Sequence, residues 1–114
     1  MRFTDSLKKN CQFRAVYKKG RSFANKLLVL YVLENGSEGN NLGLSVGKKV
    51  GNSVRRNRVS RLIRESYRLR EESLLTGRDF VVIARAGSTG KPFGEISEAL
   101  FDLLKRAGLL KNPD

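Results

Sequence analysis

Residues 42–70 read LGLSVGKKVGNSVRRNRVSRLIRESYRLR, and the spacing of their apolar residues changes partway along. From Leu42 to Gly47 apolar residues alternate with small ones, which is typical of a β-strand with one face in the core. From about residue 53 to residue 70 apolar residues recur every three or four positions, which predicts a long α-helix. Ser53 is the expected N-cap, because its hydroxyl can accept a hydrogen bond from the first turn. The stretch predicts a strand followed directly by a helix.

The segments before this stretch predict one helix and one strand. A helix is expected over residues 10–19, with Asn10 as its cap and Gly20 at its end. The unbroken apolar run LLVLYVL at 27–33 predicts a strand covered on both faces. Residues 35–41 (NGSEGNN) predict a loop, because they tolerate positive φ angles.

The segments after it predict a strand over 80–84 (FVVIA) and a final helix over about 95–107. An apolar stripe on that helix is formed by Ile96, Leu100, Leu103, Leu104 and Ala107. Three carboxylates lie opposite it: Glu95, Glu98 and Asp102. We interpret them as a solvated helix face and not as a metal site.

Gly43, Ser45 and Gly47 form the second face of the strand that begins at Leu42. A strip of such small residues leaves room for a ligand, or it lies beneath a closely packed helix. Both interpretations stay open from the sequence.

Length and composition indicate a single folded domain over residues 1–114. No apolar run approaches the roughly 18 residues of a membrane span, and the first ten residues do not resemble a secretory signal. Cys11 is the only cysteine. We therefore expect a cytoplasmic protein with no membrane association.

The positive charge is segregated along the chain. The net charge is +12, and residues 1–26 and 48–70 together hold 17 Lys or Arg against 2 acidic residues. The rest of the chain holds 6 basic and 9 acidic residues. Such segregation is typical of a protein that binds a polyanion.

The helix predicted over 53–70 has two different faces. Each residue turns the helix by about 100°, so the expected core stripe is Leu62, Leu69, Ser66, Val59 and Ile63. Four polar side chains lie within about 60° of each other on the opposite side, and we call Asn57, Arg61, Arg64 and Arg68 the arginine face. Arg56 and Ser60 extend it. Like charges at this spacing destabilise a helix, so the pattern indicates a binding surface.

Arginine in place of lysine favours phosphate as the ligand, because the guanidinium donates two parallel hydrogen bonds and stacks on bases. Lys48 and Lys49 add positive charge just before the helix N-terminus. A membrane surface is disfavoured, since the apolar face is needed for the core and offers no Trp or Phe for insertion. Nucleic acid is the favoured partner.

Four segments in the same order resemble the protein subunit of bacterial ribonuclease P. They are LKKNCQFRAVYKKGRSF (7–23), LLVLYVL (27–33), LGLSVGKKVGNSVRRNRVSRLIRESYR (42–68) and FVVIARAG (80–87). The Arg56-Asn57-Arg58 core is similar to the signature of that family. The resemblance covers nearly the whole chain.

The resemblance implies a fold and an activity. The implied fold is an α+β sandwich, with a four-stranded mixed sheet and three helices in the order α-β-β-β-α-β-α and a left-handed β-α-β crossover. Family members bind a large catalytic RNA, and together the two remove the 5′ leader from precursor tRNA. The implied role is therefore the accessory subunit of a ribonucleoprotein endonuclease, a hydrolase of tRNA processing. Mg²⁺ would be held mainly by the partner RNA and not by the protein alone.

The resemblance also implies two sets of site residues and no catalytic or metal-ligating residue. The residues expected to meet the RNA subunit are Lys48, Lys49, Arg55, Arg56, Asn57, Arg58, Arg61, Arg64 and Arg68. Those expected to meet the single-stranded leader, in a central cleft, are Phe13, Tyr17, Tyr31, Arg14 and Lys18. Ser60 stands where many members carry a lysine, and Leu110 stands near where some carry a tyrosine beside the cleft.

Other interpretations were weighed against these. Phe13 and Tyr17 are four residues apart on one helix, a spacing usual for core residues, and only the resemblance favours base stacking. An enzyme acting alone is disfavoured, because the chain has no histidine and no paired carboxylates in its basic segments. A ribosomal-type structural RNA-binding protein fits the composition, but the Arg56-Asn57-Arg58 pattern favours ribonuclease P. We expect a monomer that binds no DNA.

Overall fold

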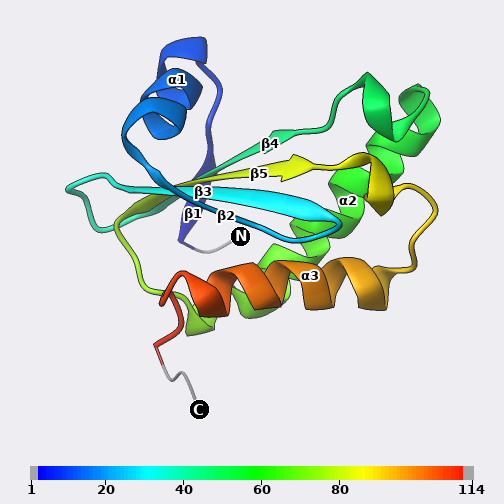
Figure 1. The fold of residues 1–114 in the computed structure, drawn as a ribbon. Coiled ribbons are helices and arrows are strands. Elements are labelled where there is room, and N and C mark those ends of the chain that lie inside the picture. Colours follow the sequence, from blue (N-terminus) through cyan, green and yellow to red (C-terminus); the bar gives the residue numbers. More distant parts are fainter. Residues whose placement is uncertain (1–2, 112–114) are drawn as a thin grey trace.

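The computed structural model describes residues 3–111, which form one five-stranded sheet and three α-helices. The strands are β1 (Thr4–Ser6), β2 (Arg21–Ala24), β3 (Leu28–Glu34), β4 (Asn40–Ser45) and β5 (Arg78–Ala84). The α-helices are α1 (Asn10–Lys19), α2 (Ser53–Arg70) and α3 (Phe93–Arg106). Short 3₁₀ turns are η1 (Lys48–Val50), η2 (Glu71–Ser73) and η3 (Ala86–Ser88). Helix α1 lies on one face of the sheet, and α2 and α3 lie side by side on the other (Figure 1).

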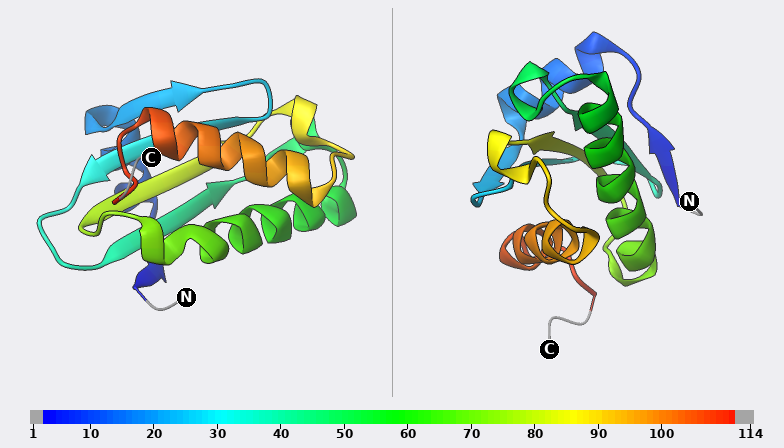
Figure 2. Two further views of the ribbon diagram at one scale, coloured as in Figure 1. Left: turned by 90° about the horizontal axis from the view of Figure 1, so that it is seen from below. Right: turned by 90° about the vertical axis from the view of Figure 1, so that its right-hand side faces the viewer.

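The sheet is mixed, with strand order β1-β4-β5-β3-β2. Strands β1, β4 and β5 are parallel neighbours, whereas β3 is antiparallel to both β5 and β2. Helix α2 connects β4 to β5 across the face that it shares with α3, and the crossover is left-handed (Figure 2). About 98% of such connections are right-handed, so the helical pattern alone would have predicted the wrong hand. The mixed sheet, three helices and crossover implied by the resemblance are confirmed.

The strand count differs from the predicted four because of β1. Its three residues are polar or exposed and carry no apolar alternation. The strand forms through backbone pairing with β4, continued by the Leu7 N–H donating to Leu42 O at 3.0 Å. A contact of 2.8 Å between the Thr4 and Tyr67 hydroxyls also ties β1 to α2. Tertiary contacts, not local pattern, make this strand.

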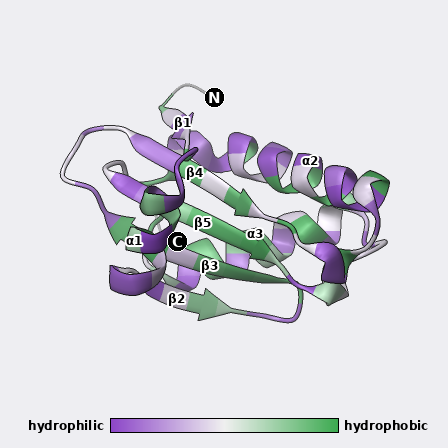
Figure 3. Cartoon of the chain, turned by 90° about the horizontal axis from the view of Figure 1, so that it is seen from above, coloured by the Kyte–Doolittle hydropathy of each residue, from purple (hydrophilic) through white to green (hydrophobic). Residues whose placement is uncertain are grey.

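The main core lies between the sheet and the α2–α3 layer. The predicted apolar stripe of α3 is buried there, together with Leu30, Phe80 and Ile63. A smaller cluster beneath α1 contains Leu7, Val16 and Val81. The strand predicted over residues 27–33 is β3, and it is therefore covered on both faces, as predicted. Figure 3 shows the apolar strands between helices whose outer surfaces are hydrophilic.

Three details of the predicted helices are wrong. The cap of α2 is Asn52, whose Oδ1 accepts from the Arg55 N–H at 3.0 Å, and not Ser53. Helix α1 already includes Asn10 and is preceded by Lys9, although Gly20 does end it. The core stripe of α2 is rotated, because Leu69 is 59% exposed and Tyr67 is only 1% exposed. The Tyr67 ring packs against Phe80 with centroids 5.7 Å apart. Tyr67 therefore belongs to the core stripe, which the predicted stripe of α2 did not include.

Candidate nucleic-acid interface

The arginine face of α2 points away from the sheet and from α3. Asn57, Arg61, Arg64 and Arg68 are all exposed. Within the described residues 3–111, the side chains of Arg61 and Arg64 have no hydrogen-bonding or ion-pair partner, whereas Arg68 is paired with Glu65 at 2.8 Å. Free guanidinium groups on one helix face are ready to bind phosphates without first breaking internal bonds.

The other arginines of α2 are bound more closely to the fold. Arg58 NH1 donates to Lys91 O at 3.0 Å, and Arg70 NH1 donates to the Ser97 hydroxyl at 2.8 Å. Arg56 is half-buried, and its buried Nε has no hydrogen-bond partner among the described residues. Arg55 is exposed at the start of the helix. The predicted RNA-subunit residues are therefore not equivalent, since Arg56 and Arg58 are only partly accessible.

Four arginines outside α2 donate to backbone carbonyls. The acceptors of Arg21, Arg78, Arg85 and Arg106 are the carbonyl oxygens of Ala107, Thr76, Asn25 and Ala24, in that order. These bonds brace turns and helix ends. The contrast with Arg61 and Arg64 supports a binding role for the arginine face.

The aromatic side chains expected at the leader lie together beneath and beside α1. The Tyr17 ring meets the Tyr31 ring edge-on with centroids 5.0 Å apart, and it lies 6.4 Å from the Phe13 ring. Tyr17 is 38% exposed, while Phe13 and Tyr31 are half-buried. We call these three residues the aromatic face. Tyr17 is its most accessible member.

Gly43 explains how Phe13 is seated. A Cβ atom at Gly43 would lie 2.6 Å from Phe13 Cζ, so the ring fits only because residue 43 has no side chain. Of the two interpretations of the small-residue strip, close packing under a helix is correct at Gly43. At Gly47, by contrast, no atom lies within 4 Å of a Cβ position. Phe13 therefore serves packing as well as any surface role.

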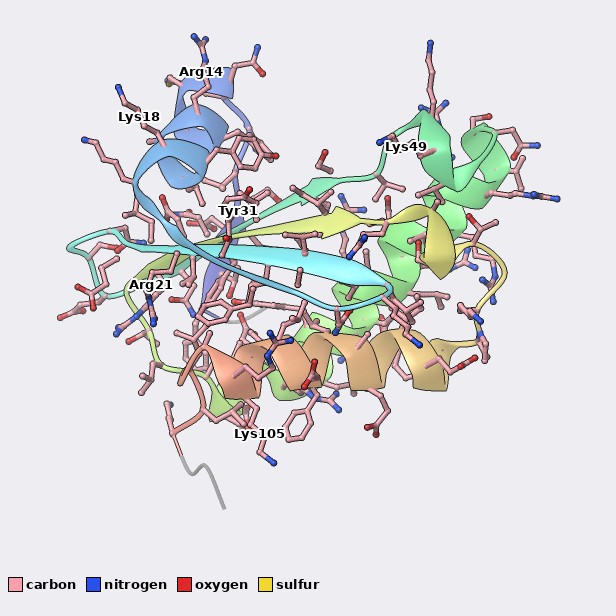
Figure 4. All side chains as sticks on the ribbon, viewed as in Figure 1. Arg14, Lys18, Arg21, Tyr31, Lys49 and Lys105 are labelled. Carbon is pink, nitrogen blue, oxygen red and sulfur yellow. The ribbon has the colours of Figure 1, made fainter. Side chains whose placement is uncertain are left out.

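Positive side chains stand on both sides of the aromatic face. Arg14 and Lys18 project outward from α1, while Tyr31 lies on the sheet below (Figure 4). Lys49, on η1, lies across the sheet on the same side as α1 (Figure 4). All three cationic side chains are exposed.

Lys49 also lines a hollow at the far end of the sheet from α1, and we call this the basic hollow. Its lining residues are Lys26, Lys49, Ile83, Ala84, Arg85, Ala86 and Gly87. Lys49 was grouped with the arginine helix, but it faces this hollow. Lys26 and Arg85 were missed as candidates. Arg85 directly follows a buried strand and Lys26 lies in a basic segment, and these signals could have marked both.

The two departures from the family pattern lie in different surroundings. Ser60 is half-buried on α2. Leu110 pairs with Leu74 and packs against the main core, on the other side of the sheet from the aromatic face. A leucine there contributes to packing.

Protonation equilibria are clearly shifted at Tyr67, Glu65 and Arg68, and the hydrogen bonds to Glu65 raise the pKa of Arg68. Burial raises the pKa of Tyr67 to about 12, against which a hydrogen bond with Thr4 acts weakly. The hydrogen bonds from Arg68 lower the pKa of Glu65, so this carboxylate is charged at neutral pH. Over residues 3–111 no three His, Cys, Asp or Glu side chains are grouped so that they could hold a metal ion. In the same range no helix has the length and apolar character needed to cross a membrane.

Comparison with known families gives a match over nearly the whole chain. The family model described as Ribonuclease P matches residues 1–108. The ribonuclease P protein component of Lachnoclostridium phytofermentans is 59% identical over 102 residues, covering 90% of this chain and 88% of the relative. That of Clostridium kluyveri is 54% identical over 107 residues, covering 92% of this chain and 96% of the relative.

Solved structures agree with the sequence matches. The RNase P protein of Staphylococcus aureus superposes with a TM-score of 0.86 at 38% identity, covering 92% of this chain and 96% of the other. The RNase P protein of Thermotoga maritima gives a TM-score of 0.82 at 32% identity, covering 90% and 96%. The range matched by the family model includes the residues of both the arginine face and the aromatic face.

Proposed function

Because the chain belongs to the ribonuclease P protein family, we propose that it binds the catalytic RNA of ribonuclease P through the arginine face and the precursor tRNA leader through the aromatic face. The single observation that carries the proposal is a pair of guanidinium groups, Arg61 and Arg64, which have no partner among residues 3–111 and lie on a helix whose other side is buried. The protein joins the RNA as a monomer, and the particle removes the 5′ leader from precursor tRNA.

The arginine face meets the phosphate backbone of the RNA subunit. An 18-residue helix presents charged groups along about 27 Å, since each residue rises about 1.5 Å. Arg55, at the N-terminal end of the helix, extends the contact beyond Arg61 and Arg64. Neutralised phosphates release counterions, so this contact is expected to be strongly salt-dependent.

The aromatic face binds the leader on the opposite side of the sheet. Tyr17 offers an accessible ring on which an unpaired base can stack, and Tyr31 supports that ring from the sheet. Arg14 and Lys18 hold the adjacent phosphates. The basic hollow, with Lys26 and Lys49, continues the positive surface away from α1. Separate surfaces allow one protein to hold catalyst and substrate together.

The cleavage chemistry belongs to the RNA. The protein has no histidine, and the described residues group no carboxylates that fit a metal ion. Mg²⁺ held mainly by the RNA would supply charge stabilisation and an activated water for phosphodiester hydrolysis. The protein's own residues bind and orient the two RNAs.

Reconstitution tests this division of labour. We expect rigorously RNA-free protein with Mg²⁺ not to cleave precursor tRNA, the RNA alone to cleave it slowly at high salt, and the two together to cleave it at physiological salt. Cleavage by RNA-free protein would refute the proposal. A ribosomal-type protein that stabilises some other RNA would instead leave the rate at physiological salt unchanged.

A further inference from the structure

Glu65 is the only acidic residue among the 18 residues of α2. It borders the arginine face, where a negative charge opposes the approach of phosphates. If α2 served only to concentrate positive charge, this carboxylate would weaken the attraction of the helix for phosphates. Its contacts indicate a different role.

The Glu65 carboxylate forms a two-pronged pair with one arginine. Arg68 Nε donates to Oε1 at 3.3 Å, and Arg68 NH2 donates to Oε2 at 2.8 Å. Arg61 lies one helical turn before Glu65 but is not paired with it. The carboxylate therefore selects Arg68, and it occupies the Nε–NH2 edge of that guanidinium.

The remaining donors of Arg68 are left in a restricted orientation. NH1 and the outer hydrogen of NH2 point away from Glu65, because the guanidinium is planar and its five N–H groups are fixed relative to one another. The side chain of Arg68 is 52% exposed and that of Glu65 is 47% exposed, so the free edge is open to solvent. A guanidinium held in this way loses less rotational freedom when it binds than a free one does.

We propose that Glu65 is a positioning residue, which fixes the guanidinium of Arg68 so that its free edge meets a phosphate of the partner RNA. The inference rests on the proposed function, since it requires that the arginine face binds RNA. Glu65 itself does not contact the phosphate. It acts only through Arg68, and its negative charge offsets part of the RNA affinity that positioning of Arg68 provides.

The positioning of Arg68 predicts that removing Glu65 weakens RNA binding. The negative charge of Glu65 alone predicts that removing it strengthens RNA binding. Affinity for the ribonuclease P RNA would be measured for the Glu65→Ala protein and for a control, Glu98→Ala. Glu98 is exposed on α3, away from the arginine face, and has no hydrogen-bonding or ion-pair partner among residues 3–111. Both substitutions raise the net charge by one unit. We expect Glu65→Ala to weaken binding about threefold, the scale of an exposed ion pair, and Glu98→Ala to leave binding unchanged or slightly tighter.

A double-mutant cycle tests whether Glu65 acts through Arg68. In an Arg68→Ala background, Glu65→Ala should no longer weaken binding, whereas Glu65→Gln in the native background should keep part of the affinity through one remaining bond. Thermal unfolding of every variant checks that α2 stays folded. Tighter binding by Glu65→Ala, or an equal loss with and without Arg68, would overturn the inference. Arg61→Ala separates the two proposals. If Glu65→Ala and Arg61→Ala both leave RNA affinity unchanged, the arginine face itself does not bind RNA.

Discussion

Replacing Tyr17 with alanine separates leader binding from packing. Tyr17 is 38% exposed and contacts the edge of Tyr31, so its loss should destabilise the fold by about 1–2 kcal/mol, below the roughly 3–5 kcal/mol of a fully buried aromatic. If an unpaired base stacks on this ring, affinity for precursor tRNA should also fall by about 1–3 kcal/mol. That is a loss of about fivefold to more than a hundredfold.

The assay compares two substrates on one reconstituted particle. Binding would be measured with a leader of one nucleotide and with a leader of several, at fixed salt, using the native and the Tyr17→Ala protein. We expect the loss to be large with the long leader and nearly absent with the short one. Affinity of the protein for the RNA subunit should hardly change, because the arginine face lies on another helix and points elsewhere.

Phe101→Ala is the matched control. Phe101 is a half-buried aromatic on α3, beneath the Arg70 guanidinium at 4.7 Å and across the sheet from Tyr17. Phe101→Ala should lower the free energy of unfolding by a similar amount. Its effect on substrate affinity should not depend on leader length. An equal loss at both leader lengths for Tyr17→Ala, or the same behaviour for both variants, would refute leader stacking at Tyr17.

Three further predictions concern the fold that supports the site. Gly43→Ala should destabilise the protein by about 1–3 kcal/mol and displace Phe13, because the new Cβ overlaps its ring; unfolding and leader affinity measure both effects. The pKa of Tyr67 is about 12 in the folded protein, above its unfolded value of 10.0. The stability that Tyr67 contributes is therefore complete below pH 10 and is lost as the pH rises through 12. Between these pH values the free energy of unfolding should fall less steeply for Tyr67→Phe than for the native protein. Asn52→Ala should cost about 1 kcal/mol in thermal unfolding, more than Ser53→Ala does, because Asn52 caps α2.

Helix α1 was predicted from Asn10 and Gly20 at its ends, and the other elements that were predicted correctly carry a run or repeat of apolar residues. The α2 and α3 helices and the strands β3 to β5 each bury a face, so burial imposes the period that the sequence carries. Strand β1 has no such period, since it forms by backbone pairing at the sheet edge. The crossover hand is likewise absent from local patterns and came only from the family resemblance.

The arginine face could be predicted because it depends only on helix geometry. The position of Lys49 could not, because it depends on how the turn before α2 is folded. Gly51 has a φ of 138°, a backbone conformation that other residues rarely adopt, and the turn there carries Lys49 toward the basic hollow instead of the arginine face. The arginine face was therefore placed on the exposed side of α2, although Leu69 was wrongly assigned to the core, and Lys49 lines a hollow away from that face.

The salt dependence of RNA binding tests the central claim most directly. The slope of log affinity against log salt concentration would be measured for the ribonuclease P RNA with the native protein, with Arg61→Ala/Arg64→Ala, and with Lys105→Ala/Lys111→Ala. The control removes two exposed charges outside the arginine face, one near the C-terminal end of α3 and one just after that helix. We expect the arginine variant to bind more weakly, with a slope reduced by about 0.7–0.9 for each lost phosphate contact and with unchanged unfolding. An unchanged slope, or a change no larger than that of the lysine variant, would contradict the assignment of the arginine face as the surface that binds the RNA.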